Sequence, residues 1–130
     1  MSKVADELMR EERLFSFQDL KVWQKAVSFA EQVIRTIDEL DTPRKHYCLV
    51  EQLEAATTSV AMNIAEGKGR QSTKEFIQFL YIARGSLFEV VTLLIILERV
   101  GWIQQKKVTM LQGMAEEIAK MINALVKSMR

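Results

Sequence analysis

The chain has 130 residues, of which 48% are hydrophobic and 27% are charged, and its formal net charge is +1. This length suffices for one domain with a hydrophobic core, and the composition excludes an intrinsically disordered chain. Because the net charge is close to zero, any binding of nucleic acid must depend on where the charges lie.

One proline and five glycines leave few forced breaks, which favours long helices over many short strands. Cys48 is the only cysteine, so no internal disulfide can form, and we expect it to be a small buried hydrophobe of a cytoplasmic protein. The N-terminal residues lack the apolar stretch of a signal peptide. The longest strongly apolar run, 90–97, is far shorter than the roughly 20 residues that span a bilayer. We therefore expect no membrane segment.

Residues 1–16 form a charged leader, for which a partly helical and a mobile state both fit the sequence, and 17–130 form the folded domain. The first helix is predicted over 19–40, because its apolar residues alternate spacings of three and four. That stripe consists of Leu20, Trp23, Val27, Ala30, Ile34 and Ile37. A second set widens it: Val22, Ala26, Phe29 and Val33.

The second helix is predicted over 43–66. Thr42 suits the N-cap, Pro43 suits the first helical position, and Gly67 and Gly69 are natural C-terminal stops. The apolar seam of this helix consists of Leu49, Leu53, Ala56, Val60 and Ile64.

The third helix is predicted over 72–100. Ser72 and Glu75 match a capping box, in which the serine oxygen accepts from the Glu75 N–H and the Glu75 side chain reaches back to the Ser72 N–H. Gly101 ends the helix. Its core seam consists of Phe76, Leu80, Ala83, Leu87, Val91 and Leu94.

The fourth helix is predicted over 104–128. One face carries Leu111, Met114, Ala115, Ile118, Met121, Ile122 and Leu125. Short connections between long helices favour an all-α fold, an antiparallel up-down-up-down four-helix bundle.

The third helix has more apolar surface than one small bundle can bury. Ile77, Tyr81, Phe88 and Ile95 fall on a second face, and Leu93 and Ile96 make the C-terminal half apolar nearly all round. Such a surface would favour aggregation if exposed, so we expect it to form an interface between copies in a closed ring or dimer. The alternative is that loops or the leader cover it.

The second helix carries a polar line beside its seam, formed by Gln52, Ser59, Asn63 and Glu66. Polar groups at a bundle edge need partners, for which Ser86 and Glu89 are candidates. We favour a hydrogen-bond network that fixes the helix register. The alternative is a small polar pocket for a ligand or metal, built from Asn63, Glu66 and Glu89.

No catalytic constellation is apparent. His46 is the only histidine, and no Glu-x-x-His pair of a di-iron bundle exists. The run 67–70, GKGR, is too short for a phosphate-binding loop and follows a helix where such loops follow a strand. We therefore expect a protein that is not an enzyme and uses no cofactor or metal.

Positive charge gathers at one end of the expected bundle, where the first and third helices begin and the second and fourth end. Its basic residues are Lys21, Lys25, Lys68, Arg70, Lys74, Lys127 and Arg130. Phosphate contacts need only local Lys and Arg side chains together with free N–H groups at helix starts. The alternative is an ordinary solvated end that the acidic leader neutralises.

Several separated blocks resemble the four-helix bundle protein family, also called the 23S rRNA-intervening sequence protein family. The blocks are FxDLxVWQKA at 17–26, QL at 52–53, SVxxNIAEGxGR at 59–70 and EFxxFLxIAxGSLxE at 75–89. The resemblance implies a short antiparallel four-helix bundle that assembles into a ring, typically a pentamer. It also implies kinship with the accessory variability determinants of diversity-generating retroelements, which bind nucleic acid and a reverse transcriptase through a basic surface. No member of the family resembles an enzyme.

The chain departs from the family pattern at Glu54 and Ala55, where members often carry two arginines. Ala61 and Met62 also stand where proline and serine are common. The missing arginines weaken nucleic-acid binding through that face, whereas Lys68, Arg70, Lys74 and Arg84 remain beside Lys21 and Lys25. We expect a homo-oligomeric scaffold or accessory protein that binds RNA or DNA, assistance to a reverse transcriptase being one form of that role. The alternative is a protein–protein interaction module that binds no nucleic acid.

Overall fold

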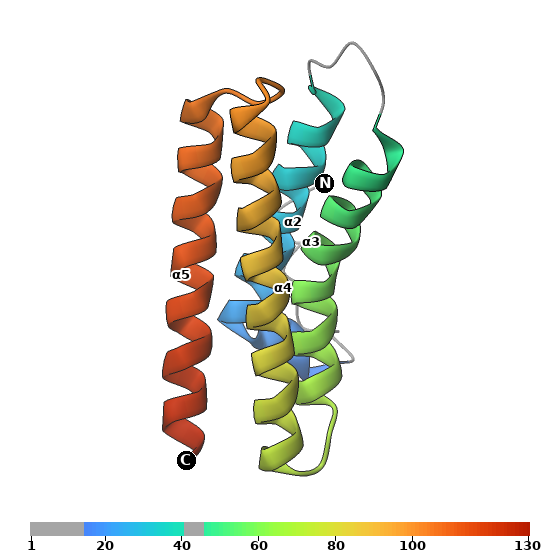
Figure 1. The fold of residues 1–130 in the computed structure, drawn as a ribbon. Coiled ribbons are helices and arrows are strands. Elements are labelled where there is room, and N and C mark those ends of the chain that lie inside the picture. Colours follow the sequence, from blue (N-terminus) through green and yellow to red (C-terminus); the bar gives the residue numbers. More distant parts are fainter. Residues whose placement is uncertain (1–14, 41–45) are drawn as a thin grey trace, which may run out of the picture.

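A computed structural model describes residues 15–40 and 46–130, and every regular element in these ranges is helical. A 3-10 turn, η1 (Ser16–Asp19), precedes four long helices that lie side by side: α2 (Lys21–Asp38), α3 (Tyr47–Lys68), α4 (Thr73–Arg99) and α5 (Gln105–Met129) (Figure 1). The predicted four-helix, all-α fold is confirmed. Most of the predicted leader and the predicted Thr42–Pro43 cap lie outside the described residues.

Each helix packs against its neighbours in the sequence, and α5 also contacts α2. The contact between α3 and α4 is the most extensive, and that between α2 and α5 is the least. The start of α2, the turn 69–72 and the C-terminus share one end of the bundle, here called the lower end. The end of α2, the start of α3 and the turn 100–104 lie at the upper end (Figure 1). η1 packs on both α2 and α3.

The core face of α2 differs from the predicted one. The residues expected only to widen the stripe, Val22, Ala26, Phe29 and Val33, are the buried ones. In the predicted central stripe, Val27 and Ile34 are exposed, and the remaining four are partly buried. Both sets have helical spacing, so the period identifies an apolar sector but not its centre, which the contacts with α3 and α5 decide.

α3 begins four residues later than predicted, at Tyr47, with exposed His46 as its N-cap. Cys48 follows in the first turn and is exposed, so its predicted burial is wrong. Gly67 lies inside the helix and is buried, and only Gly69 serves as the C-cap, with an ordinary φ of −76°. A Cβ on Gly67 would stand 2.6 Å from the Phe79 Cβ, so this glycine permits close packing of α3 on α4 and does not act as a stop.

Both ends of α4 follow from local sequence. The Ser72 hydroxyl oxygen accepts from the Glu75 backbone N–H at 3.1 Å, as predicted, while the Glu75 carboxylate meets the Ser72 hydroxyl at 3.3 Å in place of the predicted backbone N–H. At the other end Gly101 has a φ of 85°. The Trp102 N–H donates to the Leu97 carbonyl and the Gly101 N–H to the Glu98 carbonyl, at 2.9 and 3.0 Å. This is a Schellman motif, and the positive φ explains the glycine.

The core is mostly aliphatic, with Phe29 and Phe76 as its buried aromatic residues. It is centred on α4, whose predicted seam is buried except at the half-buried Val91. The predicted α3 seam is likewise buried except at Leu49. On α5, the predicted Met114, Met121 and Leu125 are only partly buried, whereas Val108 and Val126 are buried. By length and composition alone, α4 could also cross a membrane. The same two properties describe a central bundle helix, and α4 packs on both α3 and α5.

Candidate nucleic-acid interface

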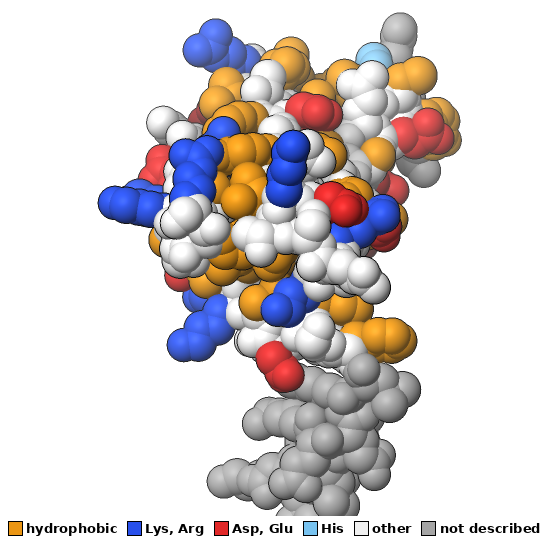
Figure 2. Space-filling view, turned by 90° about the horizontal axis from the view of Figure 1, so that it is seen from below, with side chains coloured by type: hydrophobic (Ala, Val, Ile, Leu, Met, Phe, Trp, Pro, Cys, Tyr) orange, Lys and Arg blue, Asp and Glu red, His pale blue; other side chains and the backbone are white. Residues whose placement is uncertain are grey.

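The lower end carries basic side chains from three helices. Lys21 is the first residue of α2, Lys68 is the last of α3 and Lys74 is the second of α4. Figure 2 views this end from below and shows Lys and Arg side chains around an apolar surface. The N-terminus of α4 lies at the same end, so its partial positive charge adds to theirs.

Arg70 is engaged by acidic and aromatic neighbours. Its guanidinium forms an ion pair with Glu66 at 2.7 Å and a longer contact with Glu75 at 3.9 Å. The guanidinium carbon also lies 4.9 Å from the centroid of the Phe79 ring. Arg70 therefore ties the end of α3 to the start of α4, and its charge is largely compensated.

The four lysines proposed for nucleic-acid binding fall into two groups. Lys25 pairs with Glu117 at 3.1 Å, across the contact between α2 and α5. Lys68 lies with its Nζ 5.9 Å from the Phe76 ring centroid. Within the described parts of the chain, Lys21, Lys68 and Lys74 have no carboxylate partner, so these three present uncompensated charge.

Arg84 lies on the side of the bundle, between α4 and α5. It donates to the Asn123 side-chain oxygen at 2.7 Å, and its guanidinium carbon lies 4.7 Å from the Tyr81 ring centroid. Arg130 donates to the Tyr81 hydroxyl. Sequence reasoning missed Asn123 in this cluster and the link between Tyr81 and Arg130, because residues 39 and 49 positions apart carry no local signal of contact.

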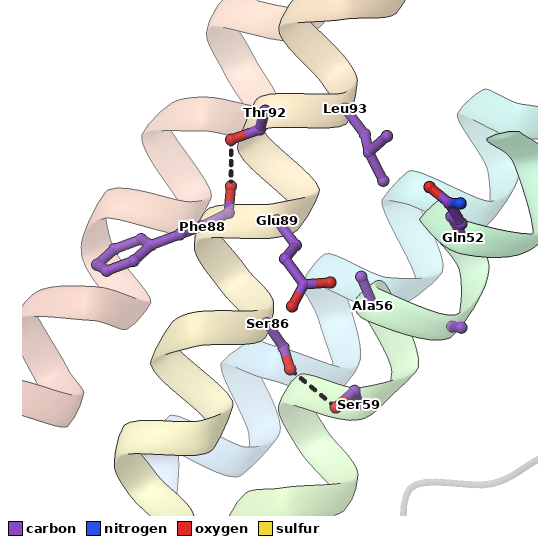
Figure 3. Close-up of a pocket in the computed structure, with 9 residues that line it drawn as sticks. Gln52, Ala56, Ser59, Ser86, Phe88, Glu89, Thr92 and Leu93 are labelled. Carbon is purple, nitrogen blue, oxygen red and sulfur yellow. Dashed lines mark hydrogen bonds between the residues drawn. The ribbon is translucent and has the colours of Figure 1, made fainter.

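The predicted polar network forms in part. The hydroxyls of Ser59 and Ser86 share a hydrogen bond of 2.9 Å between α3 and α4, and Asn63 donates to both oxygens of Ser59 at 2.8 Å (Figure 3). Glu66 pairs with Arg70 instead, and Gln52 is exposed. Every buried side-chain polar atom among the described residues has a partner. The network therefore joins α3 to α4 through three of its five predicted members.

A groove of about 640 Å³ lies above this network, between α3 and α4. Its lining includes Gln52, Ser59, Ser86 and a single carboxylate, that of Glu89. Within the described ranges, no group of three or more His, Cys, Asp or Glu side chains could hold a metal ion. The groove lacks the ligand set of a metal site.

The predicted second apolar face of α4 divides into two flanks. Figure 3 shows Leu93 and Glu89 directed toward α3, whereas Phe88 points the other way, toward α5. Phe88 is 56% exposed and Ile96 is 43% exposed, while Ile77, Tyr81, Leu93 and Ile95 are half-buried against the core. The prediction missed Ile82 and Val100, which are 52% and 54% exposed. Helical spacing places both of these on the α3 side with Leu93.

The fold and this surface define a class of protein, a four-helix bundle with basic side chains at one end. The family model of the 23S rRNA-intervening sequence protein matches residues 18–124, and the chain belongs to that family. It is also similar to a solved structure described as a protein with unknown function from the S23 ribosomal protein family of Bacteroides thetaiotaomicron VPI-5482. The two are 26% identical with a TM-score of 0.76, and the match covers 82% of this chain and 98% of the other. No curated protein matches the sequence.

Proposed function

We propose that this protein is a non-enzymatic, antiparallel four-helix bundle that assembles with copies of itself and binds RNA or DNA at its lower end. The observation that carries the proposal is the gathering of Lys21, Lys68 and Lys74, none of which has a carboxylate partner among the described residues, beside the N-terminus of α4. Three separate helices supply these cations, so the bundle fold itself brings them together. Basic side chains and a helix N-terminus are the groups that contact phosphates.

The family relationship favours RNA as the ligand. Its descriptive name refers to an intervening sequence of 23S rRNA, and the similar solved structure is assigned to a ribosomal protein family.

Self-association would support the same role, because each added copy brings another lower-end phosphate-binding site to the assembly. Ile82, Leu93, Ile96 and Val100 give the α3 side of α4 an apolar strip that a neighbouring copy would cover. A ring whose axis runs roughly parallel to the helices would bring several lower ends to one face. Several modest phosphate-binding sites on one face would then bind one polyanion with increased avidity.

The test compares two double variants with the same change in charge. The first double variant, Lys21→Glu with Lys74→Glu, removes cations from the first turns of α2 and α4 at the lower end. The second, Lys106→Glu with Lys107→Glu, removes two cations from the first turn of α5 at the upper end. Glutamate is favourable at a helix N-terminus, so all four changes are compatible with folding. Filter binding of structured RNA and duplex DNA should show a large loss of affinity for the lower-end variant, together with a smaller dependence of affinity on salt. The upper-end variant should bind nearly as well as the wild type.

Equal losses for the two pairs would show that binding is diffuse and would overturn the lower-end assignment. No retention of structured RNA or duplex DNA by the wild-type protein at low salt would overturn nucleic-acid binding at these sites altogether.

The second candidate is a protein–protein interaction module, favoured by the exposure of Ile82, Ile96 and Val100. It predicts association that is insensitive to salt and is lost in Ile96→Glu. Native mass spectrometry of wild type and Ile96→Glu, with Met62→Glu as a control at an exposed position on α3, would give the stoichiometry. A single-subunit species in the wild type at high concentration would contradict both this candidate and the ring.

A further inference from the structure

The boundary between α4 and α5 carries a pair of guanidinium groups joined by one tyrosine. Arg84 covers the face of the Tyr81 ring at 4.7 Å and is fixed by its 2.7 Å hydrogen bond to Asn123, while Arg130 donates to the hydroxyl of the same ring. In the described portion of the chain, neither arginine has a carboxylate partner. Two oriented guanidiniums without a carboxylate partner in these ranges suit an anion, because the planar fork of arginine matches a phosphate.

The same face of α5 continues this positive charge as a row. Lys120, Asn123, Lys127 and Arg130 are exposed and follow spacings of three, four and three residues, which places them on one side of the helix. The nearest acid by the same spacing is Glu116, one turn above Lys120. The lower half of this boundary is therefore a cationic track, which ends at the C-terminus, at the same end of the bundle as Lys21, Lys68 and Lys74.

An aromatic platform and an apolar pocket lie directly above the track. The guanidinium carbon of Arg84 lies 6.0 Å from the centroid of the Phe88 ring, whose side chain is 56% exposed. Beyond the ring is a pocket of about 340 Å³ between α4 and α5, whose lining includes the apolar Val91 and Ala119 and also Gln112 and Glu116. An exposed phenylalanine beside an arginine, next to a small apolar pocket, provides a flat surface on which a planar group can stack.

We propose that the boundary between α4 and α5 binds single-stranded nucleic acid, with phosphates along Arg84, Lys127 and Arg130 and one base stacked on Phe88. This inference rests on the proposed nucleic-acid role and names the form of the ligand. A row of cations beside an exposed aromatic ring is how proteins hold single strands without reading their sequence. A duplex would not use the ring, because its bases are already stacked on one another.

The experiment measures fluorescence anisotropy of a labelled eight-nucleotide oligouridylate and of an abasic oligonucleotide of the same length. Phe88→Leu keeps the apolar side chain but removes the ring, and it should weaken oligouridylate binding about tenfold and leave the abasic strand unaffected. Arg84→Lys keeps the charge but removes the fork, so it should weaken both strands. Tyr47→Leu is the matched control, because it removes a 66% exposed ring at the upper end. Thermal unfolding followed by circular dichroism confirms that each variant folds.

The inference is overturned if Phe88→Leu binds oligouridylate as well as Tyr47→Leu does. It is also overturned if polyglutamate of equal charge displaces oligouridylate as efficiently as unlabelled oligouridylate, which would indicate an acidic protein as the ligand. A different result would contradict the proposed function of the lower end: the Lys21/Lys74 and Lys106/Lys107 double variants would lose equal affinity for structured RNA. The two proposals can therefore fail separately.

Discussion

The contact between α3 and α4 and the contact between α2 and α5 are built in different ways. At the first, Gly67 lies directly against Phe79, and the hydroxyls of Ser59 and Ser86 meet across the helices. The second contact is less extensive, and there the long side chains of Lys25 and Glu117 form an exposed ion pair. Small residues allow the backbones of α3 and α4 to approach closely, whereas the long side chains between α2 and α5 keep those two helices further apart. The contact between α3 and α4 is therefore the more closely packed of the two.

The largest effect should come from closing the space at Gly67. In Gly67→Ala the new Cβ would stand 2.6 Å from the Phe79 Cβ and 3.0 Å from Phe76 Cδ1, so the helices must separate. We expect a loss of about 2 kcal/mol in the free energy of unfolding. Gly113→Ala on α5 is the control, because apart from its chain neighbours and the backbone of its own helix nothing lies within 4 Å of the added Cβ. Helix propensity predicts a gain of about 1 kcal/mol. Urea denaturation measures both, and a stabilised Gly67→Ala would contradict the close packing of α3 on α4.

A smaller effect should follow from breaking the hydrogen bond between α3 and α4. Ser86→Ala removes a buried hydroxyl and leaves Ser59 bonded only to Asn63. We expect a loss of about 1 kcal/mol in the free energy of unfolding. In a double-mutant cycle, Ser59→Ala with Ser86→Ala should cost less than the sum of the single changes. Additive losses would show that the hydroxyls do not interact.

The smallest effect should come from the ion pair between α2 and α5. Lys25 and Glu117 are about half exposed, with side-chain exposures of 52% and 54%. The coupling energy from a cycle of Lys25→Ala and Glu117→Ala should be about 0.5 kcal/mol or less, and high salt should remove it. A coupling larger than that of the serine pair would reverse the comparison between the two contacts.

The sequence predicts the number of helices, the seams of α3 and α4 and both ends of α4, because caps and heptad-like spacings are local signals. It misidentifies the inner face of α2, where Val22 and Trp23 belong to apolar sets of equal regularity. Trp23 is only partly buried and packs edge-on against Phe17 of η1, at 5.2 Å between ring centroids. A short segment before the helix therefore occupies a face that periodicity alone assigned to the core.

The candidate sites are predicted less completely than the fold. Residue type identifies Lys21, Lys68 and Lys74 as cations at one end, and the structure leaves them without carboxylate partners in the described ranges. The same reasoning treats Arg70 as an equivalent cation, although Glu66 lies one helical turn away and pairs with it. The contact of Arg84 with Asn123 depends on the register between α4 and α5, which no local pattern specifies.

The two tryptophans of the chain lie at opposite ends of the bundle. Trp23 contacts Phe17 near the lower end, and Trp102 stacks on His46 at the upper end, with 4.7 Å between ring centroids. Replacing either one with phenylalanine leaves an intrinsic fluorophore that reports on one end only. The molecule thus contains its own pair of optical probes, by which fraying of each end can be followed without an added label.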